Sequence, residues 1–166
     1  MSDKFAEDAE EEAPGRVFLI VVDESEEMQI ALRFASRRAR HTDGRVALLH
    51  VIEPTEFQHF MGVGDLLAEE ARQRAEHYIQ SLAGQVKELS GKLPVVFLRE
   101  GDRRDELLRL VQEERNISIL VLAASAQSSS PGPLIQSLTG KFVSRLRVPL
   151  TIVPGNLSEK AIDAVS

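Results

Sequence analysis

The chain has 166 residues (18.4 kDa), 43% of them hydrophobic and 28% charged, which is the composition of a single soluble globular domain. Its formal net charge of -6 argues against a nucleic-acid backbone or an anionic membrane surface as a partner, because both require a basic face. The absence of cysteine excludes disulfides, a thiolate nucleophile and a cysteine-based zinc site, and it favours a reducing compartment such as the cytoplasm.

The two ends of the chain differ in composition from the rest. Residues 1–14 contain six acidic side chains and one lysine, lack the apolar region of a signal peptide, and are expected to form an acidic disordered tail. Residues 15–155 are expected to form one folded domain, and residues 156–166, which follow a Pro-Gly pair, are expected to be a C-terminal tail. No apolar stretch approaches the roughly 18 residues of a membrane span, so no membrane partner is predicted.

Five short apolar segments predict β-strands. They are rich in β-branched residues and show no polar alternation, as is typical of strands that are buried on both faces of a parallel sheet. In chain order the predicted strands are residues 17–22, 46–52, 95–98, 117–123 and 150–153.

The segments between these strands show the apolar spacing of amphipathic helices. Ser25 is predicted to cap the first helix and Asp102 the third. The apolar stripes that define the four helices are Met28, Ala31, Leu32, Ala35 and Ala39; Ala71, Ala75, Tyr78, Leu82, Val86 and Leu89; Leu107, Leu108 and Val111; and Ile135, Leu138, Phe142 and Leu146.

Alternating strands and helices predict an α/β fold, an open five-stranded parallel Rossmann-like sheet with helices on both faces. Such sheets bind ligands beyond the carboxyl ends of their strands, where the strand order reverses. The segments to consider for a site are therefore those after the first, second and fourth strands, which begin at Asp23, Glu53 and Ala123.

Asp23 and Glu24 directly follow the first strand. Two acids there could hold a divalent metal for phosphoryl transfer, but this chemistry also needs a phosphoacceptor Asp at another strand end and a Lys near the last strand. Neither is present, so no metal site is predicted. Asp23 either orders the turn and helps to cap the first helix, or it lines a ligand site.

No motif predicts catalysis. The four histidines show neither HxH nor HExxH spacing, and His50, within the second strand, is expected to be packed and hydrogen-bonded rather than to bind metal. No Gly-x-Ser-x-Gly nucleophile elbow occurs. The sequence therefore predicts a protein that is not an enzyme and has no catalytic residues.

Five segments taken together resemble the universal stress protein family. They extend collinearly from about Arg16 to Pro154. In chain order they are Val21-Val22-Asp23-Glu24-Ser25-Glu26-Glu27 followed by Ala31-Leu32, Leu48-Leu49-His50-Val51, Glu100-Gly101-Asp102, Ile119-Leu120-Val121-Leu122-Ala123, and Val148-Pro149-Leu150-Thr151-Ile152-Val153. The resemblance implies a Rossmann-like sheet in a cytoplasmic, bacterial, usually homodimeric protein with a role in stress survival.

The resemblance also implies where a nucleotide would bind. One branch of the family binds ATP through a Gly-x-x-Gly-x9-Gly-Ser/Thr motif after the fourth strand, an acidic residue after the first strand and a backbone contact in the second. Carried onto this chain, the nucleotide site comprises Asp23, Val51, Ala123, Ala126, Gln136 and Ser137. Alanine and glutamine replace all three glycines, and their Cβ atoms resist the positive φ and the close backbone approach that phosphate binding requires.

The sequence and the resemblance together predict a non-enzymatic protein with a stress-response or regulatory role, no cofactor, and weak or absent ATP binding. The alternative is an adenine-nucleotide switch that binds ATP or AMP despite the altered loop. The predicted partner is a second copy of the chain, paired through the edge strand at residues 150–153, and no protein partner is identified.

Overall fold

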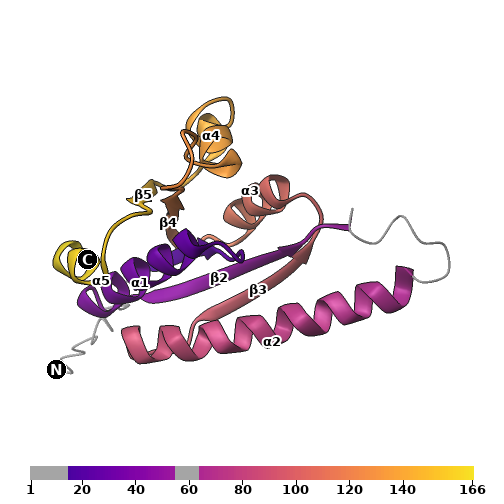
Figure 1. The fold of residues 1–166 in the computed structure, drawn as a ribbon, viewed down its shortest axis with the longest axis horizontal. Helices are drawn as coiled ribbons and strands as arrows, with labels where there is room; N and C mark the ends of the chain where they lie inside the picture. Colours follow the sequence, from indigo (N-terminus) through magenta and orange to yellow (C-terminus); the bar gives the residue numbers. More distant parts are fainter. Residues whose placement is uncertain (1–14, 55–63) are drawn as a thin grey trace, which may run out of the picture.

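The structure, a computed structural model, describes residues 15–54 and 64–166, and the acidic tail predicted at residues 1–14 lies outside them. Neighbouring strands are parallel, and the sheet of the described residues has the order β3-β2-β1-β4-β5 (Figure 1). The predicted five-stranded parallel α/β sheet is therefore confirmed. The strands are β1 (Val17–Val21), β2 (Arg45–Ile52), β3 (Val95–Glu100), β4 (Ile117–Ala124) and β5 (Leu150–Pro154).

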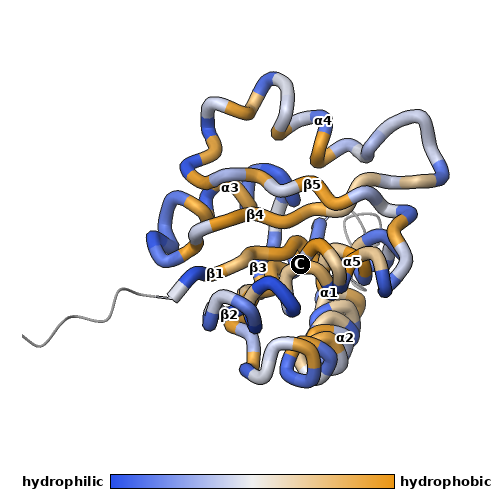
Figure 2. The backbone as a smooth tube through the Cα atoms, turned by 90° about the vertical axis from the view of Figure 1, so that its left-hand side faces the viewer, coloured by the Kyte–Doolittle hydropathy of each residue, from blue (hydrophilic) through white to orange (hydrophobic). Residues whose placement is uncertain are grey.

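Helices cover both faces of this sheet (Figure 1). On one face α1 (Glu26–His41) and α2 (Gly64–Ser90) pack on the side chains of Phe18, Ile20 and Leu48. On the other face α3 (Arg103–Glu113) and α4 (Pro133–Thr139) pack on Leu19, Leu49 and Leu120. The central strands β1 and β4 are hydrophobic along most of their length (Figure 2), because neighbouring residues of a covered parallel strand point into two different cores.

The predicted helix caps are confirmed. The Ser25 hydroxyl accepts a hydrogen bond from the backbone N–H of Met28 (3.2 Å), and the Asp102 carboxylate accepts one from the N–H of Asp105 (3.0 Å). Both caps lie at the carboxyl end of the sheet. They therefore fix the start of α1 and α3 beside the region where a ligand would bind.

The fourth helix is shorter than its apolar spacing predicted. It ends at Thr139, and Gly140 follows as its C-cap. Phe142 and Leu146 lie outside the helix, on either side of a short 3-10 turn (η2, Val143–Arg145), although both still pack against the core. The prediction of one helix through Leu146 was wrong, because an irregular segment also places apolar side chains on the core.

The C-terminal segment differs from the expected tail, because it contains α5 (Glu159–Val165), which packs against α1. Ile162 is buried at 1% exposure, and the carboxylate of Asp163 pairs with Arg33 at 2.8 Å and with Arg37 at 3.0 Å. The hydrogen bond from Arg33 lowers the pKa of Asp163 below its ordinary value. One buried apolar residue and one ion-pair cluster attach this short helix, which explains the weakness of its apolar pattern.

A membrane-spanning helix was sought in residues 15–54 and 64–166, and none of the helices there combines the length and the apolar character that a bilayer requires.

Candidate functional site

The strand order reverses between β1 and β4. The chain passes from β1 through β2 to β3 and then crosses back to place β4 on the other side of β1. In open α/β sheets the loops on either side of such a switch point leave a crevice at the carboxyl ends of the strands. Here those loops follow β1 at Asp23 and β4 at Ala124.

Asp23 organises the turn between β1 and α1. Its Oδ1 accepts hydrogen bonds from the backbone N–H of Ser25 at 2.8 Å and from the Ser25 hydroxyl at 2.5 Å, and its carbonyl oxygen accepts one from the Tyr78 hydroxyl at 2.9 Å. A carboxylate that bonds to the backbone two residues ahead forms an Asx turn, which prepares the chain for the helix cap. The structural interpretation of Asp23 is thereby supported, although the residue also lines the cavities described next.

Two neighbouring cavities lie at this end of the sheet. The smaller, about 120 Å³, is at the switch point between Asp23, Ala123 and the start of α4. The larger, about 470 Å³, lies against α2 and is lined by residues that include Asp23, His50, Val51 and Tyr78. Asp23 and Arg103 line both cavities, so these two side chains form the boundary between them.

The loop after β4 directs several backbone N–H groups into its own hydrogen bonds. The N–H of Ser125 donates to the carbonyl of Pro131 at 3.1 Å, and the N–H groups of Ser130 and Gly132 donate to the hydroxyls of Ser128 and Ser130. Pro131 and Pro133 have no N–H to donate. This loop therefore lacks much of the convergent N–H supply with which strand–helix loops bind phosphate.

The structure brings together only part of the nucleotide site expected from the sequence. Asp23 and Ala123 line the smaller cavity and Val51 lines the larger one, whereas Ala126, Gln136 and Ser137 line neither. Gln136 and Ser137 lie within α4 rather than before a helix, and the N–H of Gln136 donates to the carbonyl of Gly132 at 3.0 Å.

Arg103 is the residue of this site that sequence reasoning missed. Gly101, with a φ of +142°, turns the chain from β3 towards α3, Asp102 caps the helix, and Arg103 is its first residue. Its guanidinium Nε is buried without a hydrogen-bond partner in the described part of the chain. The rule that ligands gather at the carboxyl ends of strands applies to β3 as well, and it would have singled out this arginine.

His50 lies close to Arg103 at the carboxyl end of β2. It is half-buried, and within the described ranges its Nδ1 has no hydrogen-bond partner, so the expectation that it would be hydrogen-bonded was wrong for this atom. Burial and the positive charge of Arg103 lower the pKa of His50, while Glu24 and Asp23 act in the opposite direction. Among residues 15–54 and 64–166, no three His, Asp or Glu side chains are grouped so that they could hold a metal ion.

The depressed pKa of His50 predicts that acid destabilises the protein. As pH falls through about 6.5, histidine in the unfolded chain takes up a proton before His50 does in the folded one, so stability is lost until the pH reaches the lower folded value. We expect the urea midpoint to fall between pH 7.5 and 5.5, and to fall less in His50→Gln. His77→Gln, which changes an exposed histidine of α2, is the matched control. If the urea midpoint fell equally with pH in the native protein and in both variants, the prediction would be contradicted.

A doubly wound parallel sheet with caps and cavities at its switch point defines the class of Rossmann-like α/β proteins. Within that class, the model of the universal stress protein family matches residues 15–154. The chain therefore belongs to the universal stress protein family, as its sequence motifs suggested. No curated protein matches it.

Solved structures of the family share this fold. The chain resembles universal stress protein UspA from Lactobacillus plantarum with 19% identity and a TM-score of 0.68, covering 85% of this chain and 99% of that one. A universal stress protein in complex with cAMP is 15% identical, with a TM-score of 0.54 and coverage of 87% and 100%. A family protein from Arabidopsis thaliana with AMP bound is 14% identical, with a TM-score of 0.57 and coverage of 84% and 91%.

Proposed function

We propose that this protein is a non-enzymatic universal stress protein with a stress-response or regulatory role in the bacterial cytoplasm, and that it binds ATP weakly or not at all. The observation that carries the proposal is the loop after β4. Three of its backbone N–H groups bond within the loop, and Pro131 and the first residue of α4, Pro133, have no N–H to donate. Ala123, Ala126 and Gln136 replace the glycines of the family's ATP motif. Phosphate binding at such a loop depends on converging N–H donors.

The size and division of the cavities support the same proposal. Ligand sites for small molecules usually occupy about 300–1,000 Å³. The cavity beside Val51 has about 470 Å³ and reaches this range, but the switch-point cavity, where the phosphates would lie, has only about 120 Å³. A nucleotide that reached from Val51 to Ala123 would have to pass Arg103, which lines both cavities. Displacing this side chain would reduce the net affinity.

Catalysis is not expected at this site. The Oδ1 of Asp23 already accepts two hydrogen bonds from Ser25, so this oxygen serves the turn. Phosphoryl transfer would also require several positive groups or a metal around the γ-phosphate, and Arg103 is the single basic side chain among the described residues that line the switch-point cavity. A protein of this kind would act through its surface and its interactions rather than by turnover.

Calorimetric titration with Mg-ATP tests the proposal. Loss of two or three charge-assisted contacts, each worth about 2 kcal/mol, lowers affinity by roughly a thousandfold or more. We therefore expect no saturation below about 1 mM nucleotide. A clear isotherm in the micromolar range would contradict the proposal.

The second candidate function is an adenine-nucleotide switch. It is favoured by the two structural relatives that were crystallised with cAMP and with AMP, since a monophosphate makes fewer demands on the loop after β4. Native mass spectrometry of gently purified protein separates the two functions. Retained AMP, ATP or cAMP would favour the switch, and protein of the bare chain mass would favour the first proposal.

We also propose that the protein is a homodimer that pairs through β5. This strand is one edge of the sheet, and Ile152 is 41% exposed there. No lysine interrupts residues 149–154, so little in the strand itself opposes pairing with a second strand, and the prolines at positions 149 and 154 limit the length of the paired segment.

Ile152→Lys is expected to convert the dimer to a monomer, because a charge would be buried without a partner in the paired edge. Light scattering at micromolar concentration measures the change from twice the 18.4 kDa chain mass to the chain mass itself. Val96→Lys is the matched control, since Val96 is 42% exposed on the opposite edge strand, β3. A dimer that survives Ile152→Lys but not Val96→Lys would place the interface at β3.

A further inference from the structure

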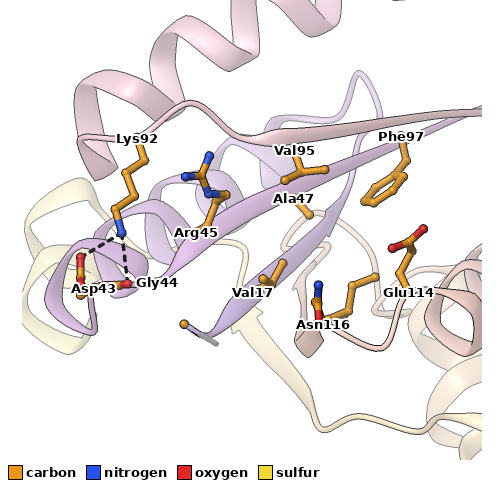
Figure 3. Close-up of a pocket in the computed structure, with 12 residues that line it drawn as sticks. Val17, Asp43, Gly44, Arg45, Ala47, Lys92, Val95, Phe97, Glu114 and Asn116 are labelled. Carbon is orange, nitrogen blue, oxygen red and sulfur yellow. Dashed lines mark hydrogen bonds and ion pairs between the residues drawn. The ribbon is translucent and has the colours of Figure 1, made fainter. Parts of the chain in front are cut away.

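A groove of about 560 Å³ lies at the amino-terminal end of the sheet, opposite the cavities described above. The apolar part of its wall comes from Val17, Val95 and Phe97, with Ala47 of the strand between them buried behind, and Arg45 and Lys92 stand at its edge (Figure 3). Val95 is 40% exposed although it belongs to a strand. This part of the sheet face is thus apolar and open.

The groove remains open because of where the helices stop. Val95 and Phe97 point to the same face as α3, since they pair with Ala47 and Leu49 of β2, whose side chains pack in the core under α3. The helix, however, ends at Glu113, and the chain returns to the sheet at Ile117. The outer strand β3 therefore keeps apolar surface that no described residue covers well.

This end of the molecule is also basic. Two carboxylates, Asp43 and Glu114, line the groove, and Asp43 is paired with the ammonium of Lys92 at 2.9 Å (Figure 3). The lining itself is balanced in charge, because Arg45 and Lys92 offset these two carboxylates. Around the lining, where the strands begin and α1 ends, Glu113 is outnumbered by basic residues, namely Arg16, Arg38, Arg40 and Arg115. The groove thus combines an apolar wall and a charge-balanced lining with basic side chains on the surface around it.

We propose that residues 1–14 of the same chain dock in this groove, with Phe5 against Val95 and Phe97. The segment joins the described chain at Gly15, which itself lines the groove. It carries six acidic residues, and the single large apolar side chain between Met1 and Pro14 is Phe5. Its chemistry, an aromatic ring among carboxylates, complements an apolar wall among arginines.

Covalent attachment makes weak contacts sufficient for docking. The nine residues between Phe5 and Gly15 make about ten Cα–Cα steps, which span up to roughly 33 Å when extended, so Phe5 can reach any part of the groove. A short tether gives an effective concentration in the millimolar range. The acidic segment would thereby cover the exposed side of β3, which a free partner must otherwise approach.

A paramagnetic label on the full chain tests the proposal. Because the chain has no cysteine, Ala9→Cys creates a single site for a nitroxide. We expect broadening of the backbone amides of Lys92, Val95 and Phe97, and none at the carboxyl end of the sheet. Phe5→Ala should reduce the equilibrium constant for docking at least tenfold, since burying a phenylalanine contributes about 1.5–3 kcal/mol.

The charge contribution is tested by Arg45→Glu, which should lower the equilibrium constant for docking roughly two- to fivefold, whereas Lys160→Glu on α5 should leave it unchanged. A mixture of spin-labelled and isotope-labelled chains identifies the occupant. Broadening in the mixture would show that a second copy's segment docks, and it would overturn the proposal. The proposal would also be overturned if no broadening were seen, or if it were spread over the whole surface. The same holds if neither Phe5→Ala nor Arg45→Glu changed the broadening.

Discussion

Replacing Gly155 with alanine is expected to lower the free energy of unfolding by about 3 kcal/mol or more. Gly155 directly follows β5, and a Cβ added there would overlap the carbonyl oxygen of Ala124 at the end of β4. It would also lie 3.3 Å from the Cβ of Glu27. A backbone carbonyl cannot move aside as a flexible side chain can, so the two strand ends would be forced apart beside the switch point. Urea denaturation should show a clearly lower midpoint.

Gly84→Ala is the matched control for this substitution. Gly84 lies in the middle of α2, and no heavy atom stands within 4 Å of an added Cβ. Alanine there should raise the free energy of unfolding by about 0.5–1 kcal/mol, because it has the higher helix propensity. The same chemical change thus has opposite signs at the two positions. A Gly155→Ala protein as stable as the native one would show that β4 and β5 do not approach so closely.

The parallel sheet could be predicted because both of its faces are covered. Side chains such as Phe18 and Leu19 point into different cores, so β1 carries no polar residue and cannot be mistaken for a half-exposed strand. The edge strand β3 was predicted too short. Its last residues, Arg99 and Glu100, are polar, and they belong to the strand through pairing with Val51 and Ile52 of β2, which hydropathy does not reveal.

Tertiary contacts explain the elements that the sequence did not predict. The short helix α5 is attached by Ile162 and by the pairs of Asp163 with Arg33 and Arg37, residues that lie about 130 positions apart in the chain. A one-dimensional pattern does not contain such pairing. The end of α4 is similar, because Phe142 keeps its place on the core without being helical and stacks beneath the guanidinium of Arg104 at 4.1 Å.

Of the candidate site, the positions at strand ends could be predicted and the interior of the loop could not. Asp23 and Val51 could be placed at the carboxyl ends of their strands from the sequence, because the predicted strand boundaries are nearly those of the structure. Whether a loop N–H faces a ligand or bonds to a neighbouring carbonyl, as that of Ser125 does, depends on backbone geometry. The burial of Arg103 likewise depends on how the turn at Gly101 directs α3.

Restoring glycine at Ala123, Ala126 and Gln136 together is expected to raise ATP affinity about tenfold to a hundredfold. Each glycine permits a closer backbone approach to phosphate, and one recovered charge-assisted hydrogen bond is worth about 1.5–3 kcal/mol. Glycine at position 136 also weakens α4 by about 1 kcal/mol, which helps to release the N–H that now bonds to Gly132. Pro131 and Pro133 still lack N–H groups, so the gain should stay below the full affinity of a complete motif.

Calorimetry of the triple variant with Mg-ATP measures this gain. Ser137→Ala added to the triple variant is the control, and it should remove most of the gain if the hydroxyl contacts the phosphates as the family motif implies. Arg103→Ala added to the same variant tests the second obstacle, because this side chain stands between the two cavities. A triple variant that binds no more tightly than the native chain would show that the loop is not what limits the nucleotide. If the triple variant bound Mg-ATP only after Arg103→Ala was added, the arginine side chain would be the feature that prevents nucleotide binding.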